Sequence, residues 1–468
     1  MNPRLLDATH RRLTVGIALG VSVVGFEALG ISTAMPAAAR ELGGVGLYGW
    51  AFTALMLGNL IGIVLASGDA DEHGPYRAYA VAISALLIGL ALGTAAQNMP
   101  TLVASRFVAG TGAGAVMLLN WTLIGRVYPE SIRSKMLAVG SAAWVIPGLV
   151  GPAASGWIAD HLTWRYVFGA LIPPLVLVAW LLLPPSHRLG RPDAPAPQPS
   201  GQPFWDADRA TRSLAAIGIS GGAALALGGF GSERWSVLIA MVGVGVFAMG
   251  IGGRTLFPAG TWRATSGLPA VVATYALLFA AFTGIESFLP LALSELRGMS
   301  STLSGVILTC GTTTWAVGSW LQARNPKRWA DPKWRMVATA TFALGLSSMV
   351  ALTFTRVPAV VTYAGWATAA LGMGLAFSSV SEATFRMVDH HRVGLASGAT
   401  QLAGALAGAL VTGFVGAVLD AGKSRAAGFR TGFLICAGLA AVAFVAGRAV
   451  PPIGADRSDA APGHNAAT

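Results

Sequence analysis

The chain has 468 residues, of which 54% are hydrophobic and only 11% are charged, and its formal net charge is +11. Soluble domains carry roughly 25% charged residues, so this composition argues against a set of ordinary soluble domains. The basic residues form neither a compact domain nor an arginine-rich tail, which argues against a nucleic-acid partner. The charges stand instead between apolar stretches of about 20 residues, each long enough to cross a bilayer as a helix.

These long apolar runs lack the alternation of a barrel, so they predict membrane-spanning helices. In chain order, the spans are expected to begin near Leu13, Leu47, Arg77, Met99, Lys135, Trp164, Arg212, Arg234, Leu268, Ser301, Met336, Val357, Val393 and Gly428. The count is fourteen, arranged as six, two and six. The first run, Leu13 to Pro36, is too long for the apolar region of a signal peptide and is interpreted as a span.

The segment from Gly190 to Pro203 is rich in proline and has no helical periodicity, which indicates a linker. We therefore expect four regions: an N-terminal six-helix bundle over 1–184, a cytoplasmic linker with two extra helices over 185–263, a C-terminal six-helix bundle over 264–450, and a disordered cytoplasmic tail over 451–468.

The positions of Lys and Arg predict the orientation. With a cytoplasmic start, 22 of the 31 basic residues fall in inside loops, 8 fall in outside loops and one, Arg106, falls within a span. Cytoplasmic loops of membrane proteins carry this excess of positive charge. We therefore expect a multi-pass protein of the cell membrane with both termini in the cytoplasm.

The two six-helix blocks repeat one another at a nearly constant offset. Gly25–Glu27 matches Gly284–Glu286 at an offset of 259, and Gly156 and Asp160 match Gly416 and Asp420 at an offset of 260. One register held across a whole block is hard to obtain by chance. The repeat predicts two pseudo-symmetric bundles with a substrate site between them, near the middle of the membrane.

The loop between the second and third spans contains Asp71, Gly74 and Arg77. A short loop needs glycine for tight backbone geometry. A carboxylate beside an arginine or at a helix N-terminus can hold one conformation. This segment resembles the cytoplasmic loop motif of the drug:proton antiporters of the major facilitator superfamily, and it departs from that motif at Glu72, where a base is common. The resemblance implies that the three residues form a conformational latch.

Two more segments carry the resemblance. In the fourth span, Leu102–Gly114 is similar to the second motif of the family, whose arginine, here Arg106, is linked to proton coupling. In the fifth span, Gly151, Pro152 and Gly156 resemble the antiporter motif, which marks export rather than uptake.

The resemblance covers essentially the whole chain, and the two extra central spans are like the fourteen-helix branch of the family. It implies an all-α integral membrane protein with the major facilitator fold, built from two six-helix bundles and two extra helices. It also implies alternating access, a small-molecule substrate exchanged for protons, no cofactor or metal, and a monomer.

Two acids lie deep in the predicted spans, Glu27 and Glu286. A charged group there costs on the order of 3 kcal/mol on insertion scales, so each is a functional hypothesis. Protonated, such an acid is neutral. Deprotonated, it can receive a cationic substrate. We predict that one of the two carries the coupling proton. The alternative is that either acid stays protonated or hydrogen-bonded and serves structure.

Two further charges have alternative interpretations. Arg106 either has a functional role, modulating proton release or binding a carbonyl network, or extends to the outer membrane interface. Glu382 stands one turn before Arg386, a spacing that predicts an ordinary salt bridge at the cytoplasmic end of a span.

The favoured function is proton-coupled export of small organic molecules, of the multidrug type. An importer or a narrow-substrate metabolite transporter of the same fold is the main alternative. A membrane-embedded enzyme is disfavoured, because the sequence has seven His and neither an HExxH pattern nor a clustered nucleophile and base.

Overall fold

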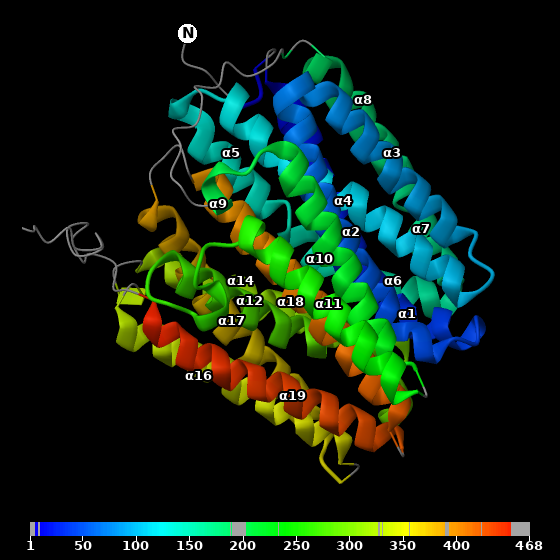
Figure 1. Cartoon of the computed structure of the whole chain (residues 1–468). Helices are drawn as coiled ribbons and strands as arrows, with labels where there is room; N and C mark the ends of the chain where they lie inside the picture. The colour runs from blue at the N-terminus through cyan, green and yellow to red at the C-terminus, as the bar shows by residue number, and fades with distance from the viewer. Residues whose placement is uncertain are drawn as a thin grey trace, which may run out of the picture.

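A computed structural model of the chain describes residues 5–7, 10–187, 189, 203–232, 234–325, 328–329, 331–354, 356–388, 393–422 and 424–450. Over these residues the protein is helical and contains no strand (Figure 1). Most of the predicted linker, residues 190–202, and the predicted tail, residues 451–468, lie outside the described residues.

In its described residues, the N-terminal half comprises eight α-helices and one short 3₁₀ helix, η1 (Val45–Leu47). The α-helices are α1 (Arg11–Glu41), α2 (Tyr48–His73), α3 (Pro75–Thr94), α4 (Met99–Val127), α5 (Glu130–Ala142), α6 (Val145–His161), α7 (Arg165–Gly169) and α8 (Ile172–His187). The predicted fifth span corresponds to α5 and α6 in succession, and the predicted sixth span to α7 and α8. Local sequence sets several boundaries: Asn98, for example, caps α4 by accepting a hydrogen bond from the backbone of Thr101.

The central insertion comprises α9 (Pro203–Asp206), α10 (Arg209–Gly229), α11 (Trp235–Leu256) and the short 3₁₀ helix η2 (Thr261–Arg263). The C-terminal half comprises α12 (Leu268–Glu286), α13 (Leu289–Arg297), α14 (Ser301–Arg324), α16 (Pro332–Ser348), η3 (Met349–Thr353), α17 (Ala359–Met387), α18 (Val393–Ala421) and α19 (Arg425–Ala446). Asp208, Ser300 and Ser424 cap α10, α14 and α19 with their side chains.

Within the described residues, thirteen helical segments are long and apolar enough to cross a membrane. The one predicted span that is not among these thirteen is α14, which has 24 residues but is less apolar because Ser, Thr and Gly are frequent in it. It packs along α6 and α17, so protein surrounds much of its polar surface. The predicted all-helical membrane fold is therefore confirmed, with α14 as its least hydrophobic span.

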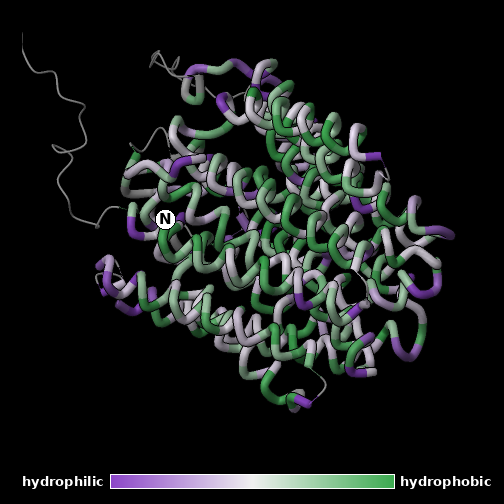
Figure 2. Tube along the Cα trace, turned by 60° about the horizontal axis from the view of Figure 1, so that its bottom comes forward, coloured by the Kyte–Doolittle hydropathy of each residue, from purple (hydrophilic) through white to green (hydrophobic). Residues whose placement is uncertain are grey.

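Hydropathy is distributed as a bilayer requires. Figure 2 shows hydrophilic segments mostly at the helix ends and loops, with hydrophobic segments along the helices. Large apolar side chains such as Ile239, Phe247 and Leu344 are 67–70% exposed. Because no water solvates the middle of a membrane, these residues face lipid.

The two halves approach each other at one end of the molecule. Figure 1 shows them converging toward the lower right and separating toward the upper left. We call the lower-right end the closed end: here α1, α6 and α18 finish, and α2 and α14 begin. The α10–α11 hairpin packs against α2 and α18 and covers one side of the boundary between the halves.

Candidate functional site

A buried ion pair occupies the core of the N-terminal half. Glu27 on α1 and Arg106 on α4 are each 1% exposed, and Arg106 Nη1 donates a hydrogen bond to Glu27 Oε1. The guanidinium also lies 6.0 Å from the centre of the Phe168 ring. Of the two interpretations of Arg106, the structure therefore disfavours extension to the membrane interface.

This ion pair is not fully satisfied. Arg106 Nε and Nη2 have no hydrogen-bond partner within the described residues. A buried donor without a partner costs about 1–3 kcal/mol, and an unpaired buried charge costs more. The carboxylate of Glu27 is therefore the group that makes the burial of Arg106 tolerable.

Glu286 stands in a different environment. It is the last residue of α12 and is half-buried. Its carboxylate makes no hydrogen bond or ion pair with any residue that the structure describes. The sequence repeat pairs Glu286 with Glu27, but among the described residues the tertiary structure gives a partner to Glu27 and none to Glu286.

An aromatic cluster lies in the C-terminal half and begins one helical turn from Glu286 on α12. It consists of Tyr275, Phe279 and Phe282 on α12, Trp315 on α14, and Trp366 and Phe377 on α17. Phe282 lies 5.0 Å from Trp315 and 4.7 Å from Trp366, measured between ring centres. Trp366 is 1% exposed, whereas Tyr275, Phe279, Trp315 and Phe377 are half-buried.

Sequence reasoning did not predict this cluster. A usable signal was present, because residues 275, 279, 282 and 286 recur at the three- and four-residue spacing of one helix face. The acid and three of the rings therefore share a stripe on α12. Aromatic faces attract organic cations, and a nearby carboxylate adds to that attraction.

The antiporter-motif residues lie where α6 crosses α14 of the other half. A Cβ atom on Gly156 would collide with the carbonyl oxygen of Ser301, and one on Gly305 would collide with the carbonyl oxygen of Pro152. Thr312 Oγ1 donates a hydrogen bond of 2.6 Å to the carbonyl oxygen of Gly148. Gly148, Pro152 and Gly156 thus form one stripe of α6 against α14.

The opposite face of the motif packs inside the N-terminal half. A Cβ atom on Gly151 would lie 3.5 Å from Phe26, the neighbour of Glu27 on α1. The hydroxyl of Thr33 donates a hydrogen bond of 3.1 Å to the carbonyl oxygen of Pro152. The motif therefore connects α1, which carries Glu27, to the crossing between the halves.

A second crossing, between α2 and α18, is related to the first by the sequence repeat. A Cβ atom on Gly49 would lie 3.0 Å from Gly416 Cα, and Gly408 packs against Met56. Gly408 and Gly416 follow Gly148 and Gly156 at the offset of 260. Small residues let the helix backbones of the two halves approach closely at both crossings.

Polar contacts join the halves at the closed end. Asp160 accepts hydrogen bonds from the backbone N–H groups of Ser301 and Thr302, at 3.0 and 2.8 Å. Arg40 donates to the hydroxyl of Ser294 at 2.9 Å, and the hydroxyl of Tyr48 donates to the carbonyl oxygen of Ser287 at 3.0 Å. None of these partners was predicted from the sequence.

The predicted latch motif lies at the turn between α2 and α3. Gly74 adopts φ +83° between α2 and α3, a backbone conformation that favours glycine. Arg77 Nε lies 3.6 Å from Asp69 Oδ1. The side chain of Asp71 lies outside the described residues.

The α10–α11 hairpin supplies a base to the same loop. Arg209, at the start of α10, forms an ion pair with Glu72 and lies 3.6 Å from Asp69. Glu72 is one of the residues at which this loop departs from the family motif, and the inserted helix provides its counter-charge. The loop is thus tethered to the insertion.

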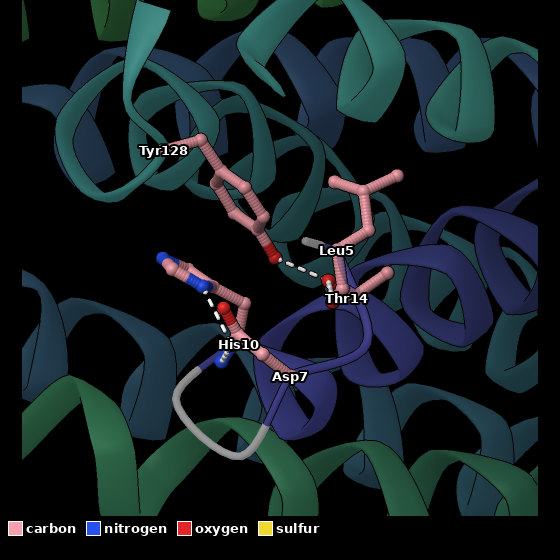
Figure 3. A network of polar contacts seen from close by, with 5 residues as sticks. All are labelled: Leu5, Asp7, His10, Thr14 and Tyr128. Atoms are coloured by element: carbon pink, nitrogen blue, oxygen red, sulfur yellow. Dashed lines mark hydrogen bonds and ion pairs between the residues drawn. The ribbon is translucent and has the colours of Figure 1, made fainter. Parts of the chain in front are cut away.

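A further polar network fixes the other end of α1 (Figure 3). The Thr14 hydroxyl donates to the carbonyl oxygen of Leu5 and lies 2.8 Å from the hydroxyl of Tyr128, which follows α4. His10 Nδ1 lies 2.8 Å from Asp7 Oδ1, and the rings of His10 and Tyr128 are 5.3 Å apart. This network fixes α1 relative to the end of α4, the same two helices that Glu27 and Arg106 join.

One other sequence interpretation, that of Glu382, can be placed. Glu382 accepts a hydrogen bond of 2.8 Å from Gln322 Nε2 on α14, a partner that the sequence did not indicate. The side chain of Arg386, its predicted partner, lies outside the described residues. Asn120 is fully buried in the N-terminal half and accepts a hydrogen bond of 3.0 Å from the hydroxyl of Tyr79.

Comparison with known proteins adds the family. The model of the Major Facilitator Superfamily matches residues 17–412. Multidrug resistance protein 3 of Bacillus subtilis is 26% identical over 36% of this chain and 33% of its own length. Multidrug export protein EmrB of Haemophilus influenzae is 27% identical over 36% of this chain and 34% of its own length. The matched region spans about a third of these curated relatives.

Solved structures agree on the architecture. A D-xylose-proton symporter has a TM-score of 0.69 at 16% identity, over 96% of this chain and 99% of that chain. An auto-inhibited POT family peptide transporter has a TM-score of 0.64 at 15% identity, over 93% and 95% of the two chains. Such low identity shows the fold alone. The fold and the family are those of membrane transporters, which excludes the enzyme alternative. This multi-pass membrane protein belongs to the Major Facilitator Superfamily.

Proposed function

We propose that the protein is a proton-coupled secondary transporter that exports small organic molecules by alternating access. One observation carries the proposal: Glu286 is a half-buried acid with no partner among the described residues, one helical turn from an aromatic cluster, on α12, which packs against α18 of the α2–α18 crossing. The multidrug names of the relatives support export and this substrate class.

Glu286 is better suited than Glu27 to carry the coupling proton. A proton on Glu27 would break its ion pair and leave Arg106 charged, buried and unpaired, at a cost of about 3–5 kcal/mol. A proton on Glu286 breaks no protein contact, since its carboxylate has no partner among the described residues. The exchange then follows from charge: the deprotonated acid attracts a cationic group, and protonation removes that attraction.

Glu27 and Arg106 have a supporting role in this scheme. Their ion pair joins α1 to α4, and the neighbour of Glu27, Phe26, packs on Gly151 of the antiporter motif. A movement of α6 against α14 therefore acts on α1 next to the ion pair. We infer that the pair keeps the N-terminal half rigid while the halves rock.

The proposed orientation follows from the charge distribution of the loops. With cytoplasmic termini, the closed end faces outward, and the protein is in an inward-facing arrangement. Opening toward the outside requires the α6–α14 and α2–α18 crossings to separate. The protein is proposed to act as a monomer in the cell membrane, with Asp71, Gly74 and Arg77 acting as a latch on the cytoplasmic side.

Import is the second candidate, because a D-xylose-proton symporter has the same fold. Direction of transport separates the two. The test uses inverted membrane vesicles with an acidic lumen, so that protons flow outward, and a fluorescent lipophilic cation added outside. Export predicts accumulation of the probe that an uncoupler abolishes and that is lost in Glu286→Gln.

Two outcomes would count against the proposal. If probe accumulation persists in Glu286→Gln but is lost in Glu27→Gln variants that remain folded, the proton carrier is Glu27. If the gradient drives the probe or other small solutes out of the vesicles, the protein is an importer. Glu286→Asp keeps the charge and serves as the matched control.

A further inference from the structure

The α11 surface carries a groove whose composition differs at its two ends. The groove has a volume of about 470 Å³ and is lined by Phe247, Gly250, Ile251, Arg254 and Trp262. Phe247, Ile251 and Trp262 are 70%, 55% and 65% exposed. One end is thus wholly apolar, and the other end carries a cation.

Local sequence builds this shape. Residues 247, 250, 251 and 254 recur at the spacing of one helix face. Gly250 has no side chain, and no other atom lies within 4 Å of the position that its Cβ atom would take, so this face is hollow there. After α11, Gly260 adopts φ +87° and turns the chain back through η2. The Trp262 ring then stands edge-on to Phe257, 5.9 Å between ring centres, and forms a side wall of the groove.

Arg254 sits where a lipid headgroup would lie. It is in the last turn of α11, a helix of 22 residues that spans the membrane, so its side chain is at the depth of the headgroups. Arg254 is exposed and makes no ion pair or hydrogen bond within the described residues. Phe247 and Ile251 lie one to two turns deeper, at the depth of acyl chains.

We propose that this groove binds an anionic glycerophospholipid, with its phosphate on Arg254 and one acyl chain along Phe247 and Ile251 beside Trp262. The charge decides the class of lipid. Arg254 is a cation without a counter-charge among the described residues, and an arginine fork matches a phosphate geometrically. A zwitterionic headgroup also offers a phosphate, but its amine would oppose the binding.

The lipid would touch a structural link to the boundary between the halves. Trp262 packs on Phe257, and Phe257 belongs to the hydrophobic cluster that α11 shares with α2, α10 and α18. An occupied groove therefore stabilises the packing of the hairpin over the α2–α18 crossing. This inference does not depend on the direction of transport or on the substrate.

The test uses the purified full-length protein in detergent. Phosphatidylglycerol and phosphatidylcholine with identical acyl chains are added separately, and bound lipid is counted by native mass spectrometry while the unfolding temperature is recorded. We expect the wild type to retain phosphatidylglycerol preferentially and to be stabilised by it. Arg254→Gln should lose that preference, and Arg254→Lys should keep part of it.

Arg234→Gln provides the matched control, because Arg234 immediately precedes α11 at its opposite end. It should keep the preference of the wild type. Trp262→Ala should lower the retention of both lipids, because it removes an apolar wall. Equal retention of the two lipids by the wild type, or an unchanged preference in Arg254→Gln, would overturn the proposal. Loss of the preference in Arg234→Gln as well would assign the effect to net charge and overturn it too.

Discussion

Asp160 at the end of α6 caps the N-terminus of α14 in the other half, with its carboxylate 2.8 Å from the backbone nitrogen of Thr302. The same carboxylate accepts a hydrogen bond of 2.7 Å from the Thr302 hydroxyl. A helix N-terminus favours a negative charge and needs acceptors for its free N–H groups. Asp160 therefore stabilises the contact between α6 and α14 that closes this end of the molecule.

Asp160→Ala is expected to favour opening at the closed end. A lost N-cap costs about 1 kcal/mol, which corresponds to about a fivefold change in the ratio of closed to open forms. Distance measurements between spin labels on the ends of α6 and α14 would detect the shift. Asp160→Asn retains one acceptor oxygen, so its ratio of closed to open forms should lie between those of the wild type and Asp160→Ala. Unchanged distance distributions in Asp160→Ala would contradict the capping role.

Gly156→Ala is expected to separate α6 from α14. The new methyl group would collide with the backbone carbonyl of Ser301, which cannot move aside as a side chain would. We expect transport to fall and the closed-end distances to grow. Gly438→Ala on α19 is the control, because nothing lies within 4 Å of a Cβ atom there. It should be neutral or stabilising by up to about 1 kcal/mol.

The Glu27–Arg106 pair is expected to show strong coupling in a double-mutant cycle. Glu27→Gln should destabilise the protein by about 3–5 kcal/mol, because it leaves a buried unpaired cation. Adding Arg106→Met should recover part of that loss. Thermal unfolding in detergent measures both effects. Glu286→Gln should change stability by less than about 1 kcal/mol while it abolishes proton-driven transport. Additive effects of Glu27→Gln and Arg106→Met would contradict the pairing.

Trp315→Ala is expected to weaken transport of aromatic cations selectively. Loss of a cation–π contact of about 1–2 kcal/mol predicts a rise in KM of roughly fivefold to thirtyfold. A non-aromatic substrate should be affected less. Trp320→Ala is the matched control on the same helix, because Trp320 is 51% exposed and carries Arg324 over its ring. Equal effects of the two substitutions would remove the aromatic cluster from the proposed substrate site.

The amino-acid sequence alone determined the fold class, the span positions and the internal repeat. Crossing a bilayer demands about 20 consecutive apolar residues with every backbone group satisfied, and this requirement is visible in composition and length. The glycines at the helix crossings could also be recognised in the sequence, because close approach of two helices selects small residues. The repeat paired Gly148 and Gly156 with Gly408 and Gly416, and both pairs lie at crossings between the halves.

Tertiary structure alone decided which polar groups meet. Glu27 and Arg106 are 79 residues apart, and Asp160 and Thr302 are 142 residues apart. In a membrane helix the lipid-facing and protein-facing sides are both apolar, so periodicity does not reveal where a lone charge points. For this reason the sequence did not distinguish Glu27 from Glu286 as the carrier of the coupling proton. In the folded protein Glu27 has a buried partner, whereas Glu286 lies one helical turn from an aromatic cluster.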